Sequence, residues 1–284
     1  MVDIHNHSKY SFDSKAEPKE MLELALLRGA KVYGFAEHVN LDEKSDINAV
    51  RKTVGAYIEE LNALQFSFEK LRVLRGVEFN YYPSQNDDYK LLTKEFDFDY
   101  VVNSVHDVRG KNCYVGYFND GKIDEGYRAY FDYLKESMEV PYPYHVLGHM
   151  GFLYKSAKNL TGEEYFHRYQ KYILEILEKV VEKGVALEAN TNTYGASFPC
   201  DPDERILRAY YEMGGRKITI GADSHSTCNV MKNVEETVRL LAKIGFTHLS
   251  YFVKGEEYRF PIEEKKILPA FDGGKNIYQK ERVL

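Results

Sequence analysis

Seven apolar segments of this chain each end in a side chain that can bind a metal ion. The end residues are His7, His38, Glu78, His106, His149, Glu188 and Asp223, separated by 31, 40, 28, 43, 39 and 35 residues. Each interval suits one strand followed by one helix. Functional side chains at the carboxyl ends of successive strands are typical of a (β/α) barrel, whose active site lies on that rim. We therefore expect a barrel of seven such units.

An open doubly wound sheet is the competing architecture. It also binds ligands beyond the carboxyl ends of its strands, but at a switch point, where seven different strands could hardly converge. Closure into a barrel is the simpler geometry. A length of 284 residues suits one such barrel, so residues 1–284 are expected to form a single domain.

Helix signals lie between the predicted strands. Pro18 marks the first turn of one helix, and Gly29 follows its last turn. Thr161 and Glu164 have the spacing of a capping box before a helix that ends near Gly184. These boundaries support the alternation of strand and helix.

Two stretches do not fit the repeat. Residues 107–143 leave the rim directly after a candidate ligand and contain an amphipathic helix through Tyr127 to Met138. A lid over the site is the predicted role of this insertion. Residues 246–284 are expected to form a terminal hairpin and a tail that serve packing.

Charge and cysteine content restrict the partners and the cellular setting. The 38 basic and 44 acidic residues give a net charge of -6 without a basic run, which argues against nucleic acid. The sequence shows neither a basic-then-apolar leader nor a long apolar run, so we expect neither secretion nor membrane insertion. Cys113, Cys200 and Cys228 are far apart, so a disulfide framework is not predicted and a reduced cytoplasmic setting fits. The oligomeric state is not specified.

Six of the nine histidines lie at predicted strand ends, where packing histidines would not be expected to gather. With three carboxylates they supply nine nitrogen and oxygen donors and no thiolate: His5, His7, Asp13, His38, Glu78, His106, His149, Asp223 and His225. Such donors suit zinc, manganese or iron. A set this large exceeds one tetrahedral site and predicts a metal cluster.

The remaining three histidines are assigned to packing or to the surface. His145 shares a strand face with His149 but lies about 13 Å back along the strand, too far for the same cluster. His167 falls among charged residues of a predicted helix, and His248 lies near the terminal hairpin.

In their order along residues 2 to about 245, the motifs resemble those of the PHP (polymerase and histidinol phosphatase) family. The His-x-His motif alone is a weak signal, whereas all the blocks in sequence are a strong one. The matching blocks are His5-x-His7, Glu37-His38, Gly76-Val-Glu78, Asn103-Ser104-Val-His106, Leu147-Gly-His149 and Ala222-Asp223-Ser-His225. Phe98-Asp-Tyr and the blocks ending in His106 and His149 favour the histidinol-phosphate phosphatase branch.

The resemblance implies a distorted (β/α)7 barrel with three divalent metal ions at the C-terminal ends of its strands. The first ion would be bound by His5, His7, Glu78 and Asp223; the second by Glu78 as a bridge, His106 and His149; the third by Asp13, His38 and His225. Glu78 and Asp223 would hold the nucleophilic hydroxide through the metals. Asp13 stands where some relatives carry a histidine, which favours a harder ion at the third site.

The charges of such a cluster suit a phosphate ester. Three divalent ions contribute +6, and three carboxylates remove 3, which leaves about +3 for a dianionic phosphate. A hydroxide bridging the first two ions would form near neutral pH and attack phosphorus in line. The third ion would neutralise the phosphoryl oxygens in the transition state.

Four residues are candidates for contacts with the substrate. Asp42 and Tyr81 fall on rim loops where the resemblance places substrate, and a solvated loop position is as plausible for each. Lys155 stands where relatives usually carry an arginine, and it supplies charge without a bidentate fork. Asn190, like Glu188, either bounds the pocket or fills the barrel. Asp42, Asp107 or a metal-bound water could protonate the leaving group.

The function implied is hydrolysis of L-histidinol phosphate to L-histidinol and phosphate, a late step of histidine biosynthesis. One alternative is another small phosphate ester, such as a nucleotide or sugar phosphate, which Lys155 and the 107–143 insertion motivate. A second alternative is a catalytically silent metal-binding domain, although the complete donor set argues against it. The acidic net charge disfavours the exonuclease branch of the family.

Overall fold

Seven parallel strands form one sheet in the order β1-β2-β3-β4-β7-β8-β9. The computed structural model describes residues 1–41, 45–113, 117, 122–157, 160–193 and 200–262, the side chains of residues 155–157 excepted. The strands span Val2–Asp3, Val32–Val39, Arg72–Asn80, Tyr100–Ser104, Val146–Leu147, Ala186–Asn190 and Ile218–Gly221, respectively.

Backbone hydrogen bonds join the first and last strands and close the sheet. Ile4 N donates to Ile220 O at 2.9 Å, and Asp223 N donates to His5 O at 2.6 Å. The predicted seven-unit barrel is confirmed. β1 itself is shorter than the predicted segment of residues 2–7, because the residues after Asp3 form this closing seam instead of a regular ladder.

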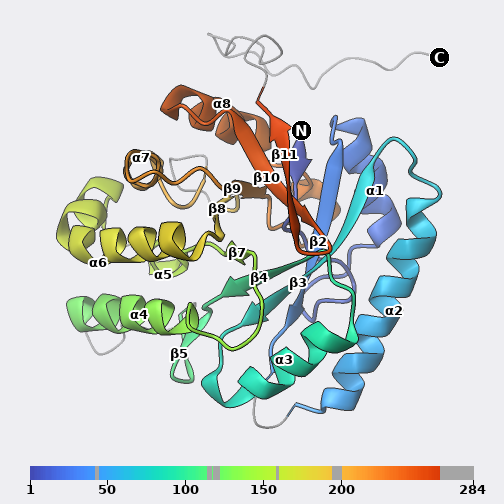
Figure 1. Cartoon of the computed structure of the whole chain (residues 1–284), viewed down its shortest axis with the longest axis horizontal. Helices are drawn as coiled ribbons and strands as arrows, with labels where there is room; N and C mark the ends of the chain where they lie inside the picture. The colour runs from blue at the N-terminus through green and yellow to red at the C-terminus, as the bar shows by residue number, and fades with distance from the viewer. Residues whose placement is uncertain (42–44, 114–116, 118–121, 158–159, 194–199, 263–284) are drawn as a thin grey trace.

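Helices surround the strands on the outside of the barrel (Figure 1). Their bounds are α1 Pro18–Leu27, α2 Ile47–Gln65, α3 Asn86–Glu95, α4 Ile123–Ser137, α5 Phe152–Ala157, α6 Gly162–Lys183, α7 Glu204–Glu212 and α8 Val234–Ile244, with 3-10 turns η1 Pro83–Gln85 and η2 Thr227–Asn229. The capping box of Thr161 and Glu164 is present, and Gly184 ends α6 in the left-handed conformation. The local signals in the sequence thus set the ends of this helix.

Tyr100 occupies the centre of the barrel and is fully buried. Its hydroxyl donates to Phe35 O at 2.9 Å and to Ile4 O, so one side chain ties β4 to the chain of β1 and β2. Gly34 and Gly76 line the ring, and a Cβ at either position would overlap it. Two strand glycines therefore make room for one large core residue.

Two segments outside the barrel repeat have their own pairing. In the 107–143 insertion, β5 (Asp107–Val108) pairs antiparallel with β6 (Lys111–Asn112) before α4. Near the C-terminus, β10 (His248–Val253) pairs antiparallel with β11 (Glu256–Pro261). The lid role of the insertion stays a prediction, and the predicted tail beyond residue 262 lies outside the described residues.

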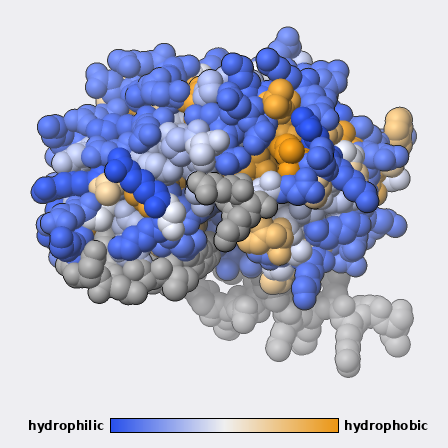
Figure 2. All heavy atoms as spheres, turned by 90° about the horizontal axis from the view of Figure 1, so that it is seen from below, coloured by the Kyte–Doolittle hydropathy of each residue, from blue (hydrophilic) through white to orange (hydrophobic). Residues whose placement is uncertain are grey.

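The face seen in Figure 2 is mostly hydrophilic, with hydrophobic side chains in small groups. Large hydrophobic residues that are exposed include Phe12, Leu27 and Phe66. In the described part of the chain, no helix is both long enough and apolar enough to cross a membrane.

Candidate metal centre

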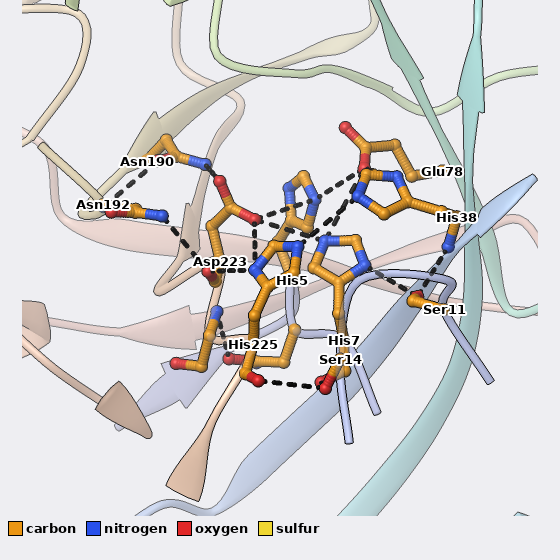
Figure 3. A network of polar contacts seen from close by, with 12 residues as sticks. His5, His7, Ser11, Ser14, His38, Glu78, Asn190, Asn192, Asp223 and His225 are labelled. Carbon is orange, nitrogen blue, oxygen red and sulfur yellow. Dashed lines mark hydrogen bonds and ion pairs between the residues drawn. The ribbon is translucent and has the colours of Figure 1, made fainter. Parts of the chain in front are cut away.

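The nine predicted donors converge at the carboxyl ends of the barrel strands. Figure 3 shows six of them: His5, His7, His38, Glu78, Asp223 and His225. His38 and Glu78 lie within β2 and β3, whereas the other histidines and Asp223 follow the ends of β1, β4, β7 and β9. Asp13 comes from the loop between β1 and α1. Parallel strands bring these side chains together because all of their carboxyl ends meet at one rim.

The four residues of the first predicted group face one another. His7 Nε2 lies 3.2 Å from Asp223 Oδ1 and 3.6 Å from Glu78 Oε2. His5 Nε2 lies 3.4 Å from Glu78 Oε2 and 4.0 Å from Asp223 Oδ1. Two imidazoles and two carboxylates therefore direct one atom each toward a common point.

The second predicted group gathers around the other oxygen of the same glutamate. Glu78 Oε1 lies 2.8 Å from His149 Nε2 and 3.4 Å from His106 Nε2, and the two imidazole nitrogens are 3.2 Å apart. Glu78 thus presents Oε2 to the first group and Oε1 to the second, as a bridging carboxylate would.

The third predicted group is closer to the surface. Asp13 Oδ2 lies 3.2 Å from His225 Nε2 and 3.5 Å from His38 Nε2, and these two nitrogens are 3.4 Å apart. His38 Nδ1 also lies 2.9 Å from Glu78 Oε2, which places this group beside the first.

The unsatisfied atoms of the centre fit divalent cations. His5 Nε2 and His7 Nε2 are buried and have no hydrogen-bond partner. Leaving such a group unpaired costs roughly 1–3 kcal/mol. Four sets of three donors have ligand atoms within 4.8 Å of one another. Imidazole and carboxylate donors of this kind are those that zinc, manganese and iron accept.

Burial and neighbouring charges set the protonation of the donors. Burial opposes the charged form of His38, but Glu78 and Asp13 outweigh burial and raise the pKa of His38 to about 10. Burial lowers the pKa of His7, and the nearby His38 and His225 lower it further. Burial would raise the pKa of Glu78, yet the surrounding imidazoles outweigh it and hold this pKa well below its usual range. His7 is therefore neutral and Glu78 is ionised, which are the metal-binding forms.

Glu188, for which the sequence left open a place beside the pocket or a barrel-filling role, contacts two of the predicted groups. Its Oε1 lies 2.5 Å from His5 Nδ1, and its Oε2 accepts a hydrogen bond from His149 N at 2.7 Å. One buried carboxylate of β8 therefore orients residues of the first and second groups. Gly221 of β9 leaves space for this pair, because a Cβ there would overlap Glu188 Oε1 and His5 Cβ. The available sequence signal was its position at a strand end.

Glu37 orients the opposite side of the centre. It accepts hydrogen bonds from Ser8 N at 3.0 Å and from Ser11 Oγ at 2.5 Å. Ser11 Oγ also lies 3.1 Å from His7 Nδ1 and accepts from His38 N at 3.0 Å. The sequence shows Glu37 beside His38 but does not show that this side chain turns toward the loop after β1.

Two of the four predicted substrate contacts are turned toward protein partners. Tyr81 is buried against Tyr133 of α4, and its hydroxyl donates to Glu136 Oε1 at 3.2 Å. This placement does not agree with a substrate contact, because the rim loop folds Tyr81 onto α4. Asn190 is fully buried, and its Nδ2 lies 3.3 Å from Asp223 Oδ2. Asn190 thus supports a metal-group carboxylate.

The side chains of the other two predicted contacts are outside the described part of the chain. Asp42 lies outside the described residues. Lys155 belongs to α5, but its side chain is likewise outside the description.

The histidines assigned to packing or the surface lie apart from the three groups. His145 Nδ1 accepts a hydrogen bond from Val101 N at 3.0 Å, and burial lowers the pKa of His145 to about 4. Its ring packs against Phe252 of the terminal hairpin. His167 and His248 are exposed.

A pocket of about 240 Å³ opens over the second and third groups. Its lining residues are Phe12, Asp13, His38, Asn40, His106, Asp107, Asn112, Phe152, Asp223 and His225. Phe152 is buried and packs against His106 and His149 with ring centroids 4.9 and 5.1 Å away. A small molecule in this pocket would touch the predicted metal ligands directly.

Comparisons with known proteins identify a family model and relatives that match most of the chain. The sequence model of the PHP domain matches residues 3–192. The histidinol-phosphatase of Lactococcus lactis is 26% identical over 256 residues, covering 88% of this chain and 94% of that protein. A Clostridium acetobutylicum protein named "Probable histidinol-phosphatase" is 26% identical over 241 residues, covering 84% of this chain and 92% of that protein.

A solved structure has the same fold. It is the crystal structure of histidinol phosphate phosphatase from Lactococcus lactis complexed with zinc, L-histidinol and phosphate. The TM-score is 0.78 at 24% sequence identity, and the match covers 90% of this chain and 98% of that chain. The whole barrel is therefore shared.

Proposed function

This chain belongs to the PHP domain family, and from that premise we propose that it is a metal-dependent phosphomonoesterase that hydrolyses L-histidinol phosphate to L-histidinol and phosphate. The observation that carries the proposal is the convergence of the nine predicted donors at one rim, where five of them line a small pocket. The relatives named histidinol-phosphatase support the choice of substrate. The proposed setting is the cytoplasm, because three unpaired cysteines suit a reducing compartment.

Three divalent ions, chosen from zinc, manganese and iron, are the proposed cofactors. They would be held by the three groups described above, with Glu78 shared between the first and second. When bound, such ions lower the pKa of water toward ~7 and offset the charge of phosphoryl oxygens.

The protein residues orient the donors and exclude water. A carboxylate can only accept, so Glu188 keeps the proton of His5 on Nδ1 and directs Nε2 toward Glu78 and Asp223. Asn190 donates to Asp223 Oδ2, which leaves Oδ1 facing His5 and His7. Phe152 covers the second group and limits solvent access.

Steady-state kinetics on L-histidinol phosphate test the proposal. We expect the metal-loaded protein to have a higher kcat/KM for this substrate than for 4-nitrophenyl phosphate or for nucleotide and sugar phosphates. Asp223→Ala should abolish turnover while retaining the barrel, as judged by circular dichroism. Equal activity on all of these esters would overturn the substrate assignment. No bound metal and no activity with added zinc, manganese or iron would instead support a catalytically silent domain.

A further inference from the structure

Asp107 is a carboxylate of the pocket that belongs to none of the three donor groups. We propose that Asp107 binds the ammonium group of the substrate and thereby selects phosphate esters that carry an amine. This inference rests on the proposed function, since it concerns how the same pocket recognises the organic part of its substrate.

The position of Asp107 is fixed relative to the second group. Tyr82 donates its hydroxyl hydrogen to Asp107 Oδ2 at 2.8 Å, and Asn80 Nδ2 donates to the same oxygen at 3.1 Å. Asn80 also accepts from His106 N at 2.8 Å through its side-chain oxygen. A single asparagine thus ties the Asp107 carboxylate to the backbone of a predicted ligand.

In the described part of the pocket, Asp107 has no cationic side chain beside it. No lysine or arginine is among the described residues that line the pocket. The carboxylates of Asp13 and Asp223 face imidazoles of the donor groups, whereas Asp107 does not. The Asp107 carboxylate is therefore placed to attract a cationic group of a molecule that enters the pocket.

L-Histidinol phosphate carries such a charge at a suitable place. In this ester the phosphate is linked through oxygen to a CH2 group, and the next carbon carries the ammonium group. Two carbon atoms therefore separate the cation from the ester oxygen. Asp107 follows His106 directly in the chain. A phosphate over the second group would therefore bring the ammonium close to Asp107, where a charge-assisted hydrogen bond can form.

The experiment compares Asp107→Asn with the wild-type, metal-loaded enzyme on three substrates. These are L-histidinol phosphate, its analogue without the amino group, and 4-nitrophenyl phosphate. We expect KM for L-histidinol phosphate to rise roughly tenfold or more in the variant, with kcat within about twofold. kcat/KM for the two amine-free esters should not fall. Asp107→Glu, which keeps the charge, should recover part of the loss.

Other outcomes would overturn the inference. A fall in kcat for both alkyl esters, with 4-nitrophenyl phosphate unaffected, would identify Asp107 as the acid that protonates the poor leaving group. Unchanged kinetics would show that Asp107 does not contact substrate. Should Asp107→Asn lose its metal or its fold, Tyr82→Phe gives the second test, because it removes one donor to Asp107 and should raise KM only for the amine-bearing ester. A wild-type enzyme that does not favour L-histidinol phosphate over other esters would refute the proposed function instead.

Discussion

Glu78 lies within 4.0 Å of five imidazoles, and no bulk water reaches it. Its negative charge is tolerated in the metal-free protein because His5 and His38, whose pKa values are raised, remain protonated beside it. A buried carboxylate and an imidazolium thus compensate each other at the place where metal ions are proposed to bind. Metal binding must then displace the proton of His38.

We predict that metal binding strengthens as the pH rises from 6 to 8. The pKa of His38 is about 10 in the folded protein against 6.5 for the free side chain, so the proton is present throughout this range and competes with the metal. Each displaced proton should lower the apparent Kd about tenfold per pH unit. Calorimetric titrations in buffers of different ionisation enthalpy measure the protons released. Binding that is independent of pH would contradict the assigned protonation.

The raised pKa of His38 makes the metal-free fold less stable as the pH rises, whereas metal binding becomes stronger. A pKa raised by folding stabilises the protein fully below the unfolded value of 6.5, and that contribution is lost as the pH rises through about 10. This group therefore makes the metal-free protein less stable at pH 9 than at pH 6.

Glu188→Gln should weaken metal binding by about 10–100-fold, because the amide cannot hold His5 as a charged acceptor does. The change conserves shape, and the barrel should remain folded. Glu182→Gln, on the exposed face of α6, is the matched control and should leave metal affinity unchanged. Metal competition with a chromophoric chelator measures both affinities. Equal affinity in the two variants would mean that Glu188 only fills the barrel.

Gly221 of β9 leaves space for the Glu188 side chain of the neighbouring strand β8. A methyl group at Gly221 would overlap Glu188 Oε1 and His5 Cβ. Gly221→Ala should therefore reduce the free energy of unfolding by about 1–3 kcal/mol, as overpacking does, and should also weaken metal binding. Gly55→Ala, inside α2, is the control, because the nearest atom to a Cβ at this position would be Phe96 Cε1 at 3.9 Å, an ordinary contact distance. That change should stabilise by about 0.5–1 kcal/mol in urea unfolding.

The strands and their functional ends are predictable because their signals are local. An apolar run that ends in histidine, glutamate or aspartate indicates both a buried strand and the side chain at its rim, as for His38 and Glu78. The contacts of Glu188 and Glu37 are not predictable in this way, because they join strands or loops that are distant along the chain. For Tyr81 the sequence indicates a position on a rim loop, but it does not indicate that the side chain packs on α4.

The proposed metal ions would connect segments that lie far apart in the sequence. The first group joins the chain after β1 to β3 and to the chain after β9, across the seam that closes the barrel. The second group joins β3 to the ends of β4 and β7. Ions bound only by the folded chain therefore stabilise the closure of the barrel as well as the reaction site.

Removal of the metals should consequently lower the Tm of the whole barrel. One site with free metal at 100 times its Kd contributes about 2.7 kcal/mol, which is roughly 5–10 °C in Tm for a chain near this length. Chelation followed by calorimetry measures the loss, and re-addition of zinc or manganese should restore it. Amide exchange should accelerate most at the seam between β1 and β9, because the first group spans it. A Tm that is unchanged by chelation, in protein shown to have lost its metal, would mean that the hydrogen bonds of the seam suffice to hold the barrel closed.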